Sequence, residues 1–289
     1  MGCLNAGSGF THWFGNIHLS GPCNRSCYFC IGQHMMELDP LNNIGVWPLE
    51  NIMGFMQQCR KHGVGEINLT GSNTDPMLYA HHAPLVSYLR MMIPGVVLGI
   101  RSNGVSTLAR IDDWRLYDKA SISVTSTDPD IYRKTMGQGS PPDVAAIVRA
   151  SVGMDIKANV VLCPETVGKD LDRTLRTLAD CGITRINLRE PYGQPHVGNP
   201  YADQPVERFV LGMPSYVRHG VVVTYWDVHY CHVESVNLYA NGRVSIEYPI
   251  TKGHSESGVV LGQENFQASG RVRDQWVGIS VGSNTKGGG

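Results

Sequence analysis

Apolar and polar positions follow two different periods along the first two thirds of the chain. In stretches such as 14–20 the apolar residues Ile17 and Leu19 alternate with polar neighbours, which predicts a β-strand. In stretches such as 168–182 apolar residues recur every three or four positions, which predicts an α-helix. By these criteria strands are expected at residues 14–20, 65–71, 95–104, 119–126, 155–162 and 183–191. Helices are expected at residues 48–63, 76–92, 106–118, 140–153, 168–182 and 205–220.

This regular alternation of strand and helix predicts six βα units. Such units form parallel strands with right-handed helical crossovers, either in a partial or complete (β/α) barrel or in an open doubly wound sheet. The fold class that we expect is α/β, with a partial, TIM-like (β/α)6 barrel and a β-rich C-terminal extension. Ligands bind at the carboxyl ends of such strands, so the loop at residues 21–34 is predicted to lie at the functional end.

The pattern changes after residue 204. Residues 221–230 alternate as a strand, and two more alternating segments flank Asn241 and Gly242, a pair that tolerates the positive φ of a tight hairpin turn. We therefore expect a barrel at residues 1–204, an extension at 205–281 that packs on the barrel, and a disordered tail at 282–289. Within the barrel, Ser140 is the expected N-cap of helix 140–153.

Composition and charge narrow the classes of function. The chain of 289 residues is 42% hydrophobic and 17% charged, which is enough apolar material for a sizeable core. Its 24 Lys and Arg balance 25 Asp and Glu, so no overall field recruits nucleic acid or an acidic membrane. The first residues lack a secretory signal, and no apolar run reaches the roughly 18 residues of a membrane span. We therefore expect a cytoplasmic protein without a membrane partner.

Cysteine usage is the most distinctive feature of the composition. Eight cysteines, three of them at Cys23, Cys27 and Cys30, suit a shared metal site in a reducing compartment better than a disulfide framework. The spacing alone leaves two kinds of site open. A closed zinc site would use the three thiolates and His34, with a structural role. An iron–sulfur cluster would use the three thiolates and leave one iron without a protein ligand.

The position of the loop favours the cluster, because structural zinc sites usually lie in small, loop-rich modules rather than after the first strand of a βα fold. The C-x3-C-x2-C spacing, with Phe29 before the third cysteine, resembles the signature of the radical S-adenosylmethionine (radical SAM) enzymes. This resemblance implies that Cys23, Cys27 and Cys30 hold a [4Fe–4S] cluster whose fourth iron binds S-adenosylmethionine. It also implies reductive cleavage to a 5′-deoxyadenosyl radical, and a low-potential electron donor such as flavodoxin or ferredoxin.

Further motifs carry the resemblance over residues 14–191. The segment TGSN at the end of the second strand is similar to the family's Gly-Gly-Glu type motif, and SNG at the end of the third is similar to its Thr-Asn-Gly. The fourth, fifth and sixth strands resemble the family's later strands. The resemblance implies cofactor contacts, by side chain or backbone, at Phe29, Gly71, Ser72, Asn73, Ser102, Ser123, Asn159, Leu188 and Glu190.

The sequence leaves the substrate open among a peptide, a nucleotide and a small molecule. Polar residues expected near the mouth of the barrel are Arg101, Asp128, Glu165, Arg189, Glu190, Tyr192, Asp227 and His229. Cys231 is the only cysteine of the extension, so no second cluster is expected and a structural role is favoured for this thiol. The alternative function is a non-catalytic zinc- or iron–sulfur-binding scaffold or sensor that uses Cys23, Cys27, Cys30 and His34.

Overall fold

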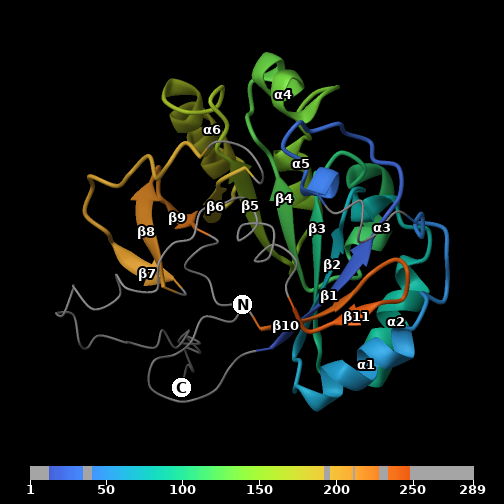
Figure 1. Cartoon of the computed structure of the whole chain (residues 1–289). Coiled ribbons are helices and arrows are strands. Elements are labelled where there is room, and N and C mark those ends of the chain that lie inside the picture. Colours follow the sequence, from blue (N-terminus) through green and yellow to red (C-terminus); the bar gives the residue numbers. More distant parts are fainter. Residues whose placement is uncertain (1–12, 35–40, 192–195, 211, 228–233, 248–289) are drawn as a thin grey trace, which may run out of the picture.

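One curved β-sheet organises the chain (Figure 1). The computed structural model describes residues 13–34, 41–191, 196–210, 212–227 and 234–247, and in that part the 11-stranded sheet has the order β11-β10-β1-β2-β3-β4-β5-β6-β9-β8-β7. Its central strands pair in parallel with their sequence neighbours, which confirms the repeated βα units. They are β1 (Phe14–Leu19), β2 (Glu66–Gly71), β3 (Val97–Ser102), β4 (Lys119–Ser123), β5 (Asp155–Val161) and β6 (Arg185–Arg189).

The helices lie on the outer side of this sheet in Figure 1. The described α-helices are α1 (Ile52–Lys61), α2 (His82–Met92), α3 (Ile111–Trp114), α4 (Pro129–Met136), α5 (Val144–Ala150) and α6 (Lys169–Asp180). Short 3-10 turns precede some of them, at η1 (Ile31–His34), η2 (Pro76–Leu78) and η3 (Leu108–Arg110). In the described part of the chain, no helix is long and apolar enough to cross a membrane.

Three helix predictions need correction, two of them at the N-terminal end and one within the helix. The helix expected from residue 76 begins only at His82, which puts Pro84 in the first turn, where a missing N–H costs nothing. The expected helix 106–118 is divided into η3 and the single turn of α3. The N-cap of α5 is Asp143 rather than Ser140, because the Asp143 carboxylate accepts a 2.8 Å hydrogen bond from the amide of Ala146.

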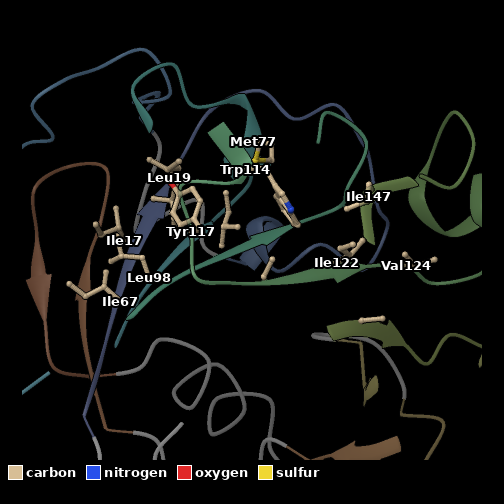
Figure 2. Close-up of a cluster of buried hydrophobic side chains, with 14 of the residues drawn as sticks. Ile17, Leu19, Ile67, Met77, Leu98, Trp114, Tyr117, Ile122, Val124 and Ile147 are labelled. Carbon is tan, nitrogen blue, oxygen red and sulfur yellow. The ribbon is translucent and has the colours of Figure 1, made fainter. Parts of the chain in front are cut away.

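The two faces of the sheet differ in polarity. Apolar side chains project toward the helices and form the core, part of which Figure 2 shows around Ile17, Leu19, Ile67 and Leu98. Gly15 also faces this side, because a Cβ at that position would contact Phe55 and Cys59 of α1. The opposite face of the same strands carries polar residues, among them Asn16, His18, Asn68, Ser121, Asn159, Asn187 and Thr224. A polar inner face suits the binding of a polar ligand inside the barrel.

The C-terminal region extends the sheet at both ends. Its strands are β7 (Arg208–Val210), β8 (Met213–Arg218), β9 (Val221–Trp226), β10 (Ser235–Leu238) and β11 (Val244–Ser245). The helix expected at 205–220 is therefore wrong: β7 and β8 form an antiparallel pair around Gly212, whose φ of 79° suits glycine. Met213, Ser215 and Tyr216 are buried along β8, and β8 also pairs with β9.

The extension is continuous with the barrel through hydrogen-bonded pairing. β9 lies parallel to β6, and β10 lies parallel to β1. The hairpin expected around Asn241 and Gly242 is confirmed, because β10 and β11 pair antiparallel around a turn in which Gly242 has a φ of 74°. The expected tail at 282–289 lies outside the described residues, so the expected domain boundaries stay a prediction.

Candidate active site

The cysteine loop after β1 is held by contacts with the loops that follow other strands. The hydroxyl of Thr74, after β2, donates to the carbonyl of Pro22 at 2.6 Å. The side-chain amide of Asn103, after β3, donates to Oδ1 of Asn24 at 2.6 Å. The amide of Ser26 donates to the carbonyl of Met136 at the end of α4. These contacts fix a loop that has no regular secondary structure of its own, because its polar groups are satisfied by its neighbours.

The three thiols of this loop border one cavity. A turn brings the later two together, since the amide of Cys30 donates to the carbonyl of Cys27 at 3.1 Å. Cys23, Cys27 and Cys30 all line a cavity of about 300 Å³ at the carboxyl ends of the central strands. The expectation that the loop lies at the functional end of the barrel agrees with this position.

The environment of the thiols opposes their ionisation. Burial raises the pKa of Cys27 to about 12, and the neighbouring thiols of Cys30 and Cys23 add to the shift. Burial likewise raises the pKa of Cys23. Three adjacent thiols become thiolates together only when a positive charge compensates them, and bound metal is the usual source of that charge in proteins.

The loop offers three thiols as donors for the iron–sulfur cluster that the sequence implies. Within the described residues, no group of three or more His, Cys, Asp and Glu side chains is arranged to hold a metal ion. The three thiols line one cavity, and a cluster takes each thiolate on a different iron, so the sulfurs need not converge on a single ion. The three cysteines therefore fit such a cluster. The side chain of His34 lies outside the described residues.

The strand ends supply the rest of the cavity wall. Of the residues expected to contact a cofactor, Phe29, Gly71, Ser102, Ser123, Asn159 and Glu190 line this cavity. Arg101 and Arg189, expected near the mouth, line it as well. Residues that lie far apart in the sequence meet here because the parallel strands end at one edge of the sheet.

Three expected contact residues lie outside the cavity lining. Ser72 is buried, and Oδ1 of Asn73 accepts hydrogen bonds from the hydroxyl of Ser20 at 3.0 Å and from the amide of Gly21. The side chain of Leu188 belongs to the apolar core, because Leu188 projects to the helix side of β6. Only its backbone remains available for the expected contact.

The other polar residues expected at the mouth are distributed differently. Asp128 caps α4 and pairs with Arg173, and Glu165 accepts a 3.0 Å hydrogen bond from the hydroxyl of Tyr28. Asp227 is described but does not line the cavity. Tyr192, His229 and Cys231 lie outside the described residues.

Asp75 is a site residue that the motif comparison missed. Its carboxylate accepts hydrogen bonds from the amide of Asn103 at 2.6 Å, from the amide of Met77 at 2.9 Å and from the hydroxyl of Ser102. Burial raises the pKa of Asp75, whereas the hydrogen bonds from the amides of Asn103 and Met77 oppose that shift. Asp75 thus joins the loop after β2 to the end of β3. The signal in the sequence was an acidic residue before Pro76, where it can cap a short helix.

His18 was missed for another reason. A lone histidine on a strand carries no motif, but His18 projects from the inner face of β1 into the cavity wall. Its ring stacks on Tyr239 with centroids 5.0 Å apart, and Nε2 lies 3.2 Å from Oδ1 of Asn237 on β10. Burial lowers the pKa of His18 to about 4, so its ring is neutral at pH 7. The period-two alternation on β1 was the available signal.

The family of the chain follows from a comparison with protein-family models. The model of the radical SAM superfamily matches residues 17–178, which is more than half of the 289 residues. The match begins in β1, includes the cysteine loop and β2–β5, and ends in α6. The chain therefore belongs to the radical SAM superfamily. Membership implies a [4Fe–4S] cluster and S-adenosylmethionine.

Solved structures show similarity over part of their length. Streptococcus suis SuiB bound to its precursor peptide SuiA has a TM-score of 0.48 and 15% identity over 62% of this chain and 40% of SuiB. Coproporphyrinogen III oxidase (HemN) of Escherichia coli has a TM-score of 0.45 and 14% identity over 64% of this chain and 45% of HemN. The chain thus spans less than half the length of these proteins. No match was found among curated proteins.

Proposed function

We propose that this enzyme cleaves S-adenosylmethionine reductively at a [4Fe–4S] cluster bound by Cys23, Cys27 and Cys30, and that the resulting 5′-deoxyadenosyl radical abstracts hydrogen from a substrate. The observation that carries this proposal is the position of the three thiols on one cavity with the polar ends of β2 to β6. Hydrogen abstraction from an unactivated carbon lies beyond acidic, basic and nucleophilic side chains, so the cofactor supplies it and the protein positions the reactants.

The residues of the cavity have separable roles in this proposal. The anchored loop holds the thiols in place. Ser102, Ser123 and Asn159 offer hydroxyl and amide groups toward S-adenosylmethionine from adjacent strands. Apolar side chains, among them Phe29 and Met136, help to exclude water from the reacting groups. A low-potential donor such as flavodoxin or ferredoxin supplies the electron, and the described cysteines, all free thiols, suit a reducing compartment such as the cytoplasm.

Anaerobic reconstitution with iron and sulfide tests the proposal. We expect a brown protein that, after reduction, converts S-adenosylmethionine to 5′-deoxyadenosine and methionine, measured by liquid chromatography. Cys30→Ala is expected to lose cluster iron and cleavage together, because the loop then offers only two thiolates. Cys181→Ala is the matched control, since Cys181 caps α6 and does not line the cavity.

The alternative functions give different results in the same experiment. A colourless protein that retains zinc and cleaves no S-adenosylmethionine would support the non-catalytic scaffold. Equal iron content in Cys30→Ala and the unaltered protein would contradict the ligand set.

A further inference from the structure

The inner face of the sheet carries several cations. Arg101 on β3 and Arg189 on β6 line the cavity, and Lys157 lies on β5 between these strands. The cavity wall also holds two carboxylates. Asp75 accepts the hydrogen bonds described above, and Glu190 accepts from the hydroxyl of Tyr225 and from the amides of residues 197 and 198. Both carboxylates are engaged in holding loops and strands together.

Other cations near the inner face have partners within the protein. Lys119 forms an ion pair with Glu66, and Arg185 forms one with Asp155. The side chains of Arg101 and Lys157 differ: within the described residues they have neither a hydrogen bond nor an ion pair. Charged groups enclosed in a protein are normally paired with opposite charges. The lack of such partners for Arg101 and Lys157 in the described part of the chain indicates that a ligand provides the negative charge.

Strand register places these two cations around a hydroxyl. In the strand register, Arg101 lies opposite Ser121 on β4, and Ser121 lies opposite Lys157 on β5. The three residues therefore form one row on the inner face. Cα atoms two strands apart are roughly 10 Å apart, a gap that an arginine and a lysine side chain can close around a small anion. Ser121 is buried between them. The row lies one layer below the pair Ser123 and Asn159 at the cofactor end.

The electrostatic environment of Lys157 agrees with this geometry. Burial lowers the pKa of Lys157 to about 7, and the charges of Arg189, Arg101, Arg185 and Lys119 contribute to the shift. Each of these influences opposes the ammonium form, whereas an anion beside Arg101 and Lys157 would favour it. Phosphate and carboxylate groups are the anions that arginine and lysine bind through charge-assisted hydrogen bonds.

We propose that Arg101, Ser121 and Lys157 bind the anionic group, a phosphate or a carboxylate, of this enzyme's substrate. The site would hold the charged end of the substrate deep in the barrel, so that the rest of the molecule extends toward the cysteine loop. The assignment of this anion to the substrate rests on the function proposed above, whereas the binding of an anion by these three residues does not.

Titration of the reconstituted, unreduced protein with inorganic phosphate and with acetate tests the site. Isothermal titration calorimetry at pH 6.5 and low ionic strength is expected to detect one saturable site. Arg101→Gln and Lys157→Gln should each weaken binding about tenfold or more, since a hydrogen bond to a charged group contributes at least that factor. Arg101→Lys, which keeps the charge, should recover part of the affinity. Arg149→Gln, on the exposed face of α5, is the control.

Each result has a defined meaning. Tighter binding of phosphate indicates a phosphorylated substrate, and tighter binding of acetate indicates a carboxylate. No saturable binding, or equal binding by the unaltered protein and both Gln variants, would overturn the inference. Displacement of bound phosphate by stoichiometric S-adenosylmethionine would also overturn it, because the cofactor's own carboxylate would then occupy the site. Should Arg101→Gln fail to fold by circular dichroism, the Lys157→Gln comparison decides.

The test separates this inference from the proposed function. Reductive cleavage of S-adenosylmethionine is measured on the same unaltered protein. If the protein cleaves no S-adenosylmethionine but binds phosphate or acetate in a way that depends on Arg101 and Lys157, the proposed function is rejected and the anion site is retained. If it cleaves S-adenosylmethionine but shows no such anion binding, the function is retained and the site is rejected.

Discussion

Lys157 is a partly buried cation that the fold surrounds with other cations. Its pKa is lowered from 10.5 to about 7, so between these values the unfolded chain holds a proton that the folded protein lacks. Burial of the charged Lys157 side chain therefore lowers the free energy of unfolding most at and below pH 7, where the folded protein must carry this charge. This energetic penalty becomes smaller as the pH rises toward 10.5.

A substitution at Lys157 tests this sign. In phosphate-free buffer, Lys157→Met should raise the free energy of unfolding by a few kcal/mol at pH 6, and the difference should shrink toward pH 10. Urea denaturation at pH 6, 8 and 10 measures it. Lys61→Met, at the exposed end of α1, serves as the control. A difference that is constant across this pH range would contradict the prediction.

Asp75 is the residue that links two cofactor motifs. Asp75→Asn keeps the volume but places an NH2 group against the amides of Met77 or Asn103, which need an acceptor. We expect a loss of about 1–3 kcal/mol of unfolding free energy and a raised KM for S-adenosylmethionine. Denaturation curves and cleavage kinetics measure these effects. Asp143→Asn is the matched control, because asparagine caps a helix as well as aspartate does; equal losses in the two variants would argue against the linking role.

At the scale of elements, the turn after β2 depends on a close approach of the backbone. A Cβ at Gly71 would overlap the carbonyl oxygen of Thr74, whereas a Cβ at Gly65, before the same strand, meets nothing within 4 Å. Gly71 also lines the cavity, so the turn that it permits is part of the site. The two glycines therefore form a matched pair for an experiment.

Gly71→Ala should lower the free energy of unfolding by about 1–3 kcal/mol, a cost typical of overpacking, and should raise the KM for S-adenosylmethionine. Gly65→Ala should leave both quantities near those of the unaltered protein. Thermal denaturation and initial rates of 5′-deoxyadenosine formation provide the comparison. If both alanines are tolerated equally, the turn is not constrained in the way described.

At the scale of the whole molecule, the C-terminal extension completes the sheet by pairing with β1 and with β6. β9 pairs with β6 through residues 185–189 and 222–226, and β10 pairs with β1 through residues 14–17 and 235–238. Asn237 on β10 also accepts a 2.9 Å hydrogen bond from the side-chain amide of Asn16. Removal of the extension would expose two strand edges and the apolar residues packed beneath them.

A chain that ends at residue 204 tests this dependence. We expect aggregation or loss of cooperative unfolding, because unpaired strand edges associate and the core loses Val221, Val223 and Leu238. Size-exclusion chromatography and thermal circular dichroism measure the outcome. A monomeric fragment with one cooperative transition would mean that the barrel at 1–204 is an independent domain.

Local rules account for much of the fold and part of the site. The period-two strands predicted β1 to β6, and Asn241 with Gly242 predicted the hairpin, because these patterns act within a few residues. The segment 205–220 was mistaken for a helix, since short apolar runs fit either period and the pairing of β8 with β9 decided between them. The side chain of Leu188 lies in the core on the helix side of β6, so the expected contact at this position stays a prediction for the backbone.

The sequence by itself determined the family, the alternation of strands and helices, and the loop that carries Cys23, Cys27 and Cys30. These features depend on residue types at short spacing. Only the tertiary structure decided that Asp75 and His18 belong to the cavity wall and that Arg101, Ser121 and Lys157 form one row. The physical reason is strand register: it brings together residues that are distant in the chain, and nothing in their local spacing records which of them will become neighbours.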